Sequence, residues 1–404
     1  MICFILWAGS SFAEQAQLGI IINTGEDKGC FSWIQERMSG PSRPAMHNIM
    51  TTIADIHAAS YGENYFILEG EGVNQVTKYN IATQDDPEPE WQYSAISESE
   101  SITKDTLPID ILFIDTNKAY LLRYASPEAW IINPSADEES SFYSGTINLD
   151  SYNDNDGSPE MTCGIAVGEK AFIVLKRMDA TNDTYDTAYI AVIDINTDSE
   201  IDIGIDTNLN GIPLNVKNPV SIHYLESTDK LYVLGTLAGD SWGGIEEIDP
   251  NGYTQTVIIE GTSQKYFTEM ALIAEDDGFI LAASSPDVQT VCHLNLSEKT
   301  IKDVAFNTTV TGYLENKKLR GMALDQHDKL WLANQTDRTI HVINSASNNG
   351  LYTCEETIEI DSNYGVEMYP KQITFCMEAD TDEESRKPSS AGESGNFCFI
   401  ETLR

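Results

Sequence analysis

Two stretches of the sequence combine acidic, amide and glycine residues at the alternating spacing of a calcium loop. Residues 206–213 read DTNLNGIP, so Asp206, Asn208 and Asn210 stand at alternate positions before a glycine. Alternate side-chain oxygens can converge on one cation while glycine allows the sharp turn. The twelfth position is Lys217 rather than a bidentate glutamate, so the pattern predicts a partial calcium site. An ordinary polar turn is the alternative interpretation.

The second stretch, residues 154–160, reads DNDGSPE and offers Asp154, Asp156 and Glu160 as oxygen ligands. Tyr152 stands where the leading aspartate of the first pattern would be, and Asp150 or Glu160 is available to compensate. We expect the two stretches to form similar connections between neighbouring structural repeats. Calcium is therefore the predicted cofactor, again with ordinary turns as the alternative.

Seven apolar segments each have one polar residue at or just before their start. If these segments surround a channel, the seven residues form a mostly acidic collar at its mouth. Such a collar suits a cation or a polar ligand. The alternative interpretation is that polar residues begin strands because strand ends are exposed to solvent. The collar residues are Asp55, Asp110, Glu160, Asn218, Glu269, Arg320 and Gln372.

Two loop stretches add candidate contact residues. Trp242 stands in LAGDSWGG between polar and glycine residues. A tryptophan there is a candidate for contact with a ligand, and the alternative is that it supports a neighbouring repeat. Asp183 lies in the longest such stretch, KRMDATNDTYDTA at 176–188. Serine nucleophile elbows, phosphate-binding glycine loops and CxxCH sites are absent, so neither nucleotide nor haem is expected.

A short phrase repeated six times indicates the elements that position these residues. Each copy is an apolar strand-like run that ends in Asn or Asp, and successive copies lie 53, 61, 55, 46 and 49 residues apart. Two further apolar runs joined by a tight polar turn precede each copy, which makes a four-stranded unit with the strand that follows. The terminal Asn or Asp is expected to cap the next turn. The copies end at Asn80, Asn133, Asp194, Asp249, Asn295 and Asn344.

The two ends of the repeat region predict a seventh unit. Residues 18–25 and 30–36 look like second and third strands without a first, and residues 371–378 look like a first strand without the others. Joined, they close a ring and remove its exposed edges. The sequence therefore predicts an all-β fold, a single seven-bladed β-propeller over residues 14–379, closed by strands from both termini.

The flanking segments and the composition bound the surroundings. Residues 1–13 read as a truncated signal peptide that lacks the usual basic start, and residues 380–404 as a disordered, charged and Ser/Gly-rich tail ending in FCFIETLR. No segment is long and apolar enough to insert in a membrane. The formal charge of -40, from 64 acidic and 24 basic residues, disfavours nucleic acid as a partner. The cysteines, none in CxxC form, are expected to be mostly unpaired and buried.

Some phrases carry a resemblance to a known group. LWLAN at 330–334 and KLYVLG at 230–235 are degenerate relatives of the YVTN phrase of surface-layer-type β-propellers. The run NLDSYNDNDGSPEM, with TAYIAVIDINTDSEID after it, resembles secreted bacterial propellers of unassigned activity, and Cys398-Phe399-Ile400 is similar to the tail of some secreted bacterial proteins. The resemblance implies architecture and a secreted, periplasmic or cell-surface location, and it brings no catalytic motif.

Together these features predict an extracytoplasmic binding or interaction module. Calcium would stabilise it on its loop face, the face of the propeller that carries the connections between blades around the channel mouth. Its partner would be a protein, a glycan or a small polar ligand. A metal-dependent hydrolase of lactonase type, which would use the collar carboxylates, is the first alternative. A structural cell-surface component is the second.

Overall fold

The structure is a computed structural model, and it describes most of the chain between residues 17 and 377. The described ranges are 17–35, 46–50, 53–83, 88–97, 105–179, 184–205, 209–307, 314–348, 350–360 and 367–377. The predicted signal peptide at 1–13 and the predicted tail at 380–404 lie outside them.

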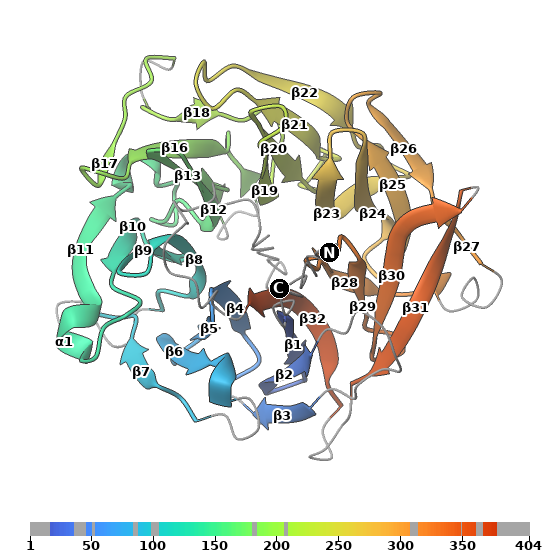
Figure 1. The fold of residues 1–404 in the computed structure, drawn as a ribbon. Coiled ribbons are helices and arrows are strands. Elements are labelled where there is room, and N and C mark those ends of the chain that lie inside the picture. The colour runs from blue at the N-terminus through green and yellow to red at the C-terminus, as the bar shows by residue number, and fades with distance from the viewer. Residues whose placement is uncertain are drawn as a thin grey trace, which may run out of the picture.

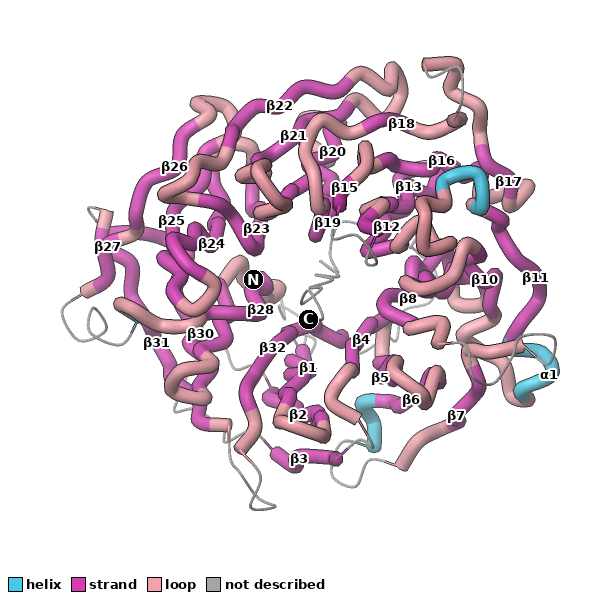
Figure 2. Tube along the Cα trace, turned by 180° about the vertical axis from the view of Figure 1, so that it is seen from behind, coloured by secondary structure: helices cyan, strands magenta, loops and turns pink. Residues whose placement is uncertain are grey.

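The described residues form seven β-sheet blades arranged in a ring around a central opening (Figure 1). The tube seen from behind shows the same ring, with short loops joining the strands of each blade (Figure 2). The innermost strands lie side by side in the order β32, β4, β8, β12, β19, β23, β28 and back to β32. The predicted seven-bladed propeller is therefore confirmed.

Blades 1 to 3 hold the following elements. Blade 1 has β32 (Tyr369–Met377), β1 (Gln17–Thr24), β2 (Gly29–Gln35) and β3 (Met46–Met50) from the channel outward. Blade 2 has β4 (Ile56–Tyr61), β5 (Asn64–Glu69), β6 (Gln75–Asn80), the short helix η1 (Ile81–Thr83) and β7 (Trp91–Ser94). Blade 3 has β8 (Pro108–Asp115), β9 (Lys118–Arg123), β10 (Glu128–Ile132), α1 (Glu139–Phe142) and β11 (Tyr143–Asn148).

Blades 4 and 5 follow a short helix, η2 (Asp150–Tyr152). Blade 4 has β12 (Met161–Val167), β13 (Lys170–Leu175), β16 (Tyr189–Asp194) and an outer strand in two pieces, β17 (Ser199–Glu200) and β18 (Ile212–Pro213). It also carries a small hairpin of β14 (Met178–Asp179) and β15 (Thr184–Tyr185). Blade 5 has β19 (Pro219–Leu225), β20 (Lys230–Gly235), β21 (Gly244–Ile248) and β22 (Gln255–Glu260).

Blades 6 and 7 complete the ring. Blade 6 has β23 (Tyr266–Ala274), β24 (Asp277–Ser285), β25 (Val288–Asn295) and β26 (Thr300–Asp303). Blade 7 has β28 (Leu319–Leu324), β29 (Leu330–Asn334), β30 (Thr339–Asn348) and β31 (Leu351–Glu359), with β27 (Ala305–Phe306) parallel to β31.

Blade 1 is built from both ends of the chain, as the unmatched strand phrases predicted. Strand β1 pairs antiparallel with β2 on one side and with β32 on the other, with Ile20 opposite Thr374 and Ile21 opposite Ile373. In Figure 1 the blue β1 and the dark red β32 lie next to each other. The ring is thereby closed by backbone hydrogen bonds between segments about 350 residues apart in the sequence.

The core lies between neighbouring blades. One hydrophobic cluster, for example, joins Ile20 and Trp33 of blade 1 to Ile56 and Tyr65 of blade 2. The second strand of a blade is apolar along its whole length because it has a neighbouring blade on each face; KLYVLG is buried at every position after Lys230. The described cysteines are all unpaired, and only Cys354 is not fully buried.

The repeated Asn or Asp residues act as predicted, as caps of the turn after the third strand. In each copy one side-chain oxygen accepts a hydrogen bond of 2.7–3.0 Å from a backbone N–H two or three residues further on. Such a bond replaces a backbone partner and fixes the direction of the turn. The repeated phrase is therefore part of the scaffold.

Gln372 ties the closing strand to the next blade, which makes the closure testable. Its amide accepts a hydrogen bond from Ala58 N (3.0 Å) and donates one to Ala58 O (2.8 Å). We expect Gln372→Met to lower the free energy of unfolding by about 1–3 kcal/mol, because two buried backbone groups of Ala58 lose their partner. Urea unfolding measures the change. Gln92→Met is the control, since Gln92 is exposed on the outer strand β7; an equal loss there would contradict the role of Gln372.

Candidate functional site

Three carboxylates meet in the connection between blades 3 and 4. Single oxygen atoms of Asp154, Asp156 and Glu160 all lie within 4.8 Å of one another. Within the described part of the chain this is the one group of three or more His, Cys, Asp or Glu side chains that converges in this way. These are the residues that the sequence pattern DNDGSPE offered as ligands.

The loop that carries them is shaped by its own short polar side chains. Asp154 accepts a hydrogen bond from Asp156 N (3.0 Å), and Asp156 accepts one from Ser158 N (3.2 Å). Gly157 has a φ of 95°, which a side chain would disfavour, so the loop reverses there. Asn155 donates to the buried Asp179 of β14 (3.0 Å), which joins the loop to the hairpin inserted in blade 4.

Glu160 connects this loop to the loop that follows β13. It is 2% exposed, and its two oxygens accept from Ser158 Oγ (2.5 Å) and Met178 N (2.7 Å). Its own carbonyl oxygen accepts from Lys176 N (3.0 Å). A change in the charge or position of Glu160 therefore acts on both loops at this edge of the channel.

The three carboxylates are held at an electrostatic cost. Burial, with the charges of Asp154 and Asp156, raises the pKa of Glu160 to about 8. Burial, with the charges of Asp156 and Asp179, raises the pKa of Asp154 to about 6. Asp154 Oδ2 is buried and has no hydrogen-bond partner. A bound cation would relieve this repulsion and give that oxygen a partner, and hard divalent cations prefer such oxygen ligands.

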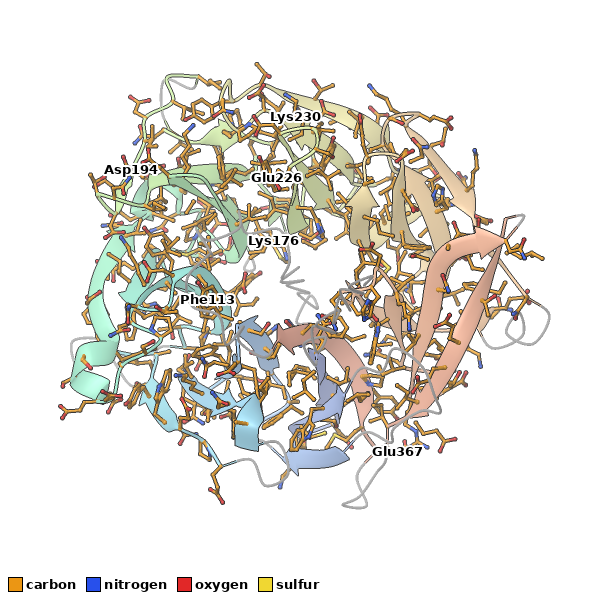
Figure 3. The ribbon with its side chains drawn as sticks, viewed as in Figure 1. Phe113, Lys176, Asp194, Glu226, Lys230 and Glu367 are labelled. Carbon is orange, nitrogen blue, oxygen red and sulfur yellow. The ribbon has the colours of Figure 1, made fainter. Side chains whose placement is uncertain are left out.

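A buried lysine lies beside this group. Lys176 is 1% exposed, and its Nζ lies 5.8 Å from the ring centre of Tyr124 and 5.7 Å from that of Tyr185. Burial lowers the pKa of Lys176 to about 8, against the charge of Glu160, which acts to raise it. Figure 3 shows Lys176 at the inner rim of the ring, beside the central opening.

Two of the predicted collar residues bind the backbone of the next blade: Glu269 on β23 accepts from Gly321 N of β28 (2.9 Å), and Gln372 on β32 binds Ala58 of β4. Asp110 on β8 accepts instead from its neighbour Ile111 N (2.8 Å), and its Oδ2 is buried without a hydrogen-bond partner. The backbone of Gly164 on β12 lies near enough to Asp110, and that of Ile222 on β19 near enough to Cys163, to act to lower their pKa values against the larger effect of burial. We call Asp110, Cys163, Glu269 and Gln372 the inner belt, because each lies against the next innermost strand around the channel.

The other collar residues are placed differently. Asp55 is partly buried and lies 3.5 Å from His57 Nε2. Burial acts to raise the pKa of Asp55, but the hydrogen bond from His57 and the charges of His57 and Lys371 together lower it. Asn218 donates to Leu237 O (2.7 Å) in its own blade. Arg320 on β28 lies near enough to Glu269 for its charge to lower the pKa of that carboxyl, against the larger effect of burial. Among the described residues, none of the three joins a converging carboxylate group.

The D-x-N-x-N-G stretch lies elsewhere than expected. It falls between β17 and β18, which both pair with β16, so it interrupts the outer strand of blade 4 rather than joining two blades at the channel. Asp206 and Asn208 lie outside the described residues, and Asn210 donates to Glu200 (3.0 Å). The sequence did not reveal this because a strand of two residues is too short to show the alternation of apolar and polar residues that predicts a strand.

The structure describes one of the two candidate contact residues on the loop face, Trp242, and not the other, Asp183. Asp183 lies outside the described residues. Trp242 is half-buried, and its backbone packs on the end of β22: a Cβ added to Gly261 would lie 2.0 Å from Trp242 O. Gly261 N also donates to Gly243 O (3.1 Å). These contacts fix the loop, and a ligand-contact role for Trp242 stays a prediction.

Sequence reasoning missed Lys176, Tyr124, Tyr185 and Asp179. One indication of Lys176 was present in KAFIVLKR, where a lysine directly follows an apolar strand. A charged residue is unusual at the end of a buried strand. The tyrosines gave no indication, since aromatic residues are common in strands.

Comparisons with known proteins support the fold. Solved structures that resemble the chain include a periplasmic gluconolactonase from Pseudomonas aeruginosa, with 11% identity, a TM-score of 0.59, and coverage of 89% of this chain and 99% of that one. A protein from Lactobacillus plantarum has 9% identity, a TM-score of 0.55 and coverage of 89% and 99%. A functionally unknown protein from Desulfotomaculum acetoxidans has 13% identity, a TM-score of 0.51 and coverage of 90% and 99%.

No family model and no curated protein matches the sequence. At these identities the structural likeness shows the fold alone, a seven-bladed β-propeller. None of the helices in the described ranges has the length and apolar character needed to cross a membrane.

Two belt carboxylates predict how stability varies with pH. Burial raises the pKa of Asp110 and of Glu269 to about 7 each, from ordinary values of 3.8 and 4.5. Between about pH 4 and pH 7 the folded protein holds protons that the unfolded chain releases, so stability falls as pH rises through this range. We expect the double variant Asp110→Asn, Glu269→Gln to lose part of this slope, on the order of 1–3 kcal/mol per carboxyl between pH 5 and pH 8.

Urea unfolding at pH 5 and pH 8 in the presence of chelator checks this expectation. Asp249→Asn is the control, because the hydrogen bond from Lys230 lowers the pKa of Asp249 to about 2 and its titration falls below the tested range. An unchanged slope in the double variant would show that the two belt carboxyls do not titrate there.

Proposed function

We propose that the protein is a binding module that takes up a divalent cation, calcium in the first place, at Asp154, Asp156 and Glu160. The single observation that carries the proposal is the convergence of these three side chains within 4.8 Å, together with the unpartnered Asp154 Oδ2. Calcium takes six to eight oxygen ligands, so three carboxylates leave room for backbone oxygens, water or a ligand. The cation would stabilise the loop before β12 and the loop after β13 together.

The location and relatives of the module are part of the same proposal. The apolar N-terminal stretch MICFILWAGSSFA and the YVTN-like strand phrases support a secreted, periplasmic or cell-surface propeller of the surface-layer type. The periplasmic location of the Pseudomonas protein is in keeping with this. A protein, a glycan or a small polar ligand would bind on the loop face around the cation.

Cation binding is tested by thermal unfolding in excess Ca²⁺ and in chelator. We expect Ca²⁺ to raise the melting temperature by several degrees, since a ligand at a hundredfold excess over its Kd adds about 2.7 kcal/mol to the folded state. Asp156→Asn should lose most of this shift, because it keeps the hydrogen bond from Ser158 N but removes a charge.

Asp115→Asn is the matched control. Asp115 is also exposed and accepts a hydrogen bond from the backbone N–H of Asn117, two residues on (2.7 Å). It is the last residue of β8, at the end of this strand that is far from the loop before β12. An equal Ca²⁺ response with and without Asp156, or no response in the wild type, would contradict the proposed site.

A metal-dependent hydrolase of lactonase type is the second candidate function. Its site would be Asp154, Asp156 and Glu160 instead of the whole collar. It is favoured by the coordination positions that three carboxylates leave open on a bound cation, where a lactone oxygen could bind, and by the likeness of the fold to that of the Pseudomonas gluconolactonase. We expect any lactone hydrolysis to require Ca²⁺ and to fall at least about a hundredfold in Glu160→Gln. A panel of lactones assayed in Ca²⁺ and in chelator decides it; activity that survives both changes would exclude this site.

A further inference from the structure

The ammonium group of Lys176 has three N–H donors and no acceptor among the described residues. No carboxylate oxygen of the described residues lies within 4.0 Å of Lys176 Nζ, and the ammonium group lies over the rings of Tyr124 and Tyr185. Buried donors in folded proteins are normally satisfied, and a buried charge without a partner is costly. The ammonium group of Lys176 is therefore open to a partner from outside the described chain.

The nearest carboxylate does not serve as that partner. Glu160 lies one backbone hydrogen bond away, through Lys176 N, yet its two oxygens are directed to Ser158 Oγ and Met178 N. Lys176 also differs from Lys170 at the other end of β13. Lys170 likewise lies over a tyrosine ring, that of Tyr253 at 4.8 Å, but its Nζ donates to Pro250 O (3.1 Å).

Tyr124 connects Lys176 to the acidic group. Its ring lies 5.8 Å from Lys176 Nζ, and after burial the charges of Glu160, Asp156 and Asp154 contribute to raising the pKa of its hydroxyl. The ammonium group, the tyrosine and the three carboxylates are therefore close enough to act on one another. Figure 3 shows Lys176, the labelled member of this set, at the inner rim of the ring.

We propose that Lys176 binds the carboxylate of a small anionic ligand, and that a second oxygen of this ligand completes the coordination of the cation at Asp154, Asp156 and Glu160. The inference rests on the proposed cation site. A 2-hydroxycarboxylate has the required chemistry, because its carboxylate suits an ammonium group and its hydroxyl oxygen suits a hard cation.

The charge of the protein makes this binding conditional on the cation. A net charge of -40 repels anions in general, and three carboxylates repel them locally. A bound divalent cation removes most of the local repulsion and supplies an attraction of its own. The ligand is therefore expected to bind only after the cation.

Glycolate, the simplest 2-hydroxycarboxylate, is the probe, and its uncharged amide, glycolamide, is the matched compound. In excess Ca²⁺ we expect glycolate, but not glycolamide, to raise the melting temperature of the wild type further, and to have no effect in chelator. Lys176→Met should keep the Ca²⁺ shift while its apparent Kd for glycolate rises about tenfold or more. Lys170→Met, the control at the first residue of β13, should keep both responses.

The outcomes separate the two proposals. Loss of both responses in Asp156→Asn and loss of the glycolate response alone in Lys176→Met support the inference. A normal Ca²⁺ shift with no glycolate response in the wild type, an unchanged glycolate response in Lys176→Met, or a glycolate response in chelator overturns it. Absence of the Ca²⁺ shift itself overturns the cation site instead. If Lys176→Met does not fold, Lys176→Gln replaces it, with the same expected loss.

Discussion

Every innermost strand of the ring has one edge that pairs with no other strand, and the rest of the structure depends on how that edge is satisfied. Unpaired backbone groups at a sheet edge are costly when buried and promote aggregation when exposed. Along part of the ring this edge is covered by side chains of the preceding blade. Glu269 and Gln372 bind backbone groups of the next innermost strand, and Asp110 and Cys163 lie against it.

This constraint explains why the acidic collar is not one site. Glu269 accepts from Gly321 N with one oxygen, which fixes the direction of its carboxylate toward the neighbouring strand. Asp110 and Glu269 are both buried, each with one oxygen that has no hydrogen-bond partner, and burial raises their pKa to about 7. Among the described residues the carboxylates that converge are those of the loop before β12.

The sequence located the acidic group of blade 4 but not its surroundings. The pattern DNDGSPE placed Asp154, Asp156 and Glu160 within one short loop. Almost any turn brings together residues that are so near one another in the sequence. The segment that follows β12 and β13 in the sequence contributes Lys176, Asp179 and Tyr185, and the previous blade contributes Tyr124. Nothing in their local sequence could reveal that they meet, because the ring geometry alone brings them together.

What the sequence by itself determined is the repeated scaffold: four-strand units, Asn and Asp caps after each third strand, and a seventh blade assembled from both ends. These follow from local turn chemistry and from the apolar strand pattern, which act within a few residues. Only the tertiary structure decided which polar residues bind backbone, which remain without a partner, and that the D-x-N-x-N-G stretch interrupts an outer strand. Those outcomes depend on contacts between blades, and the distances between blades are set by the closure of the whole ring.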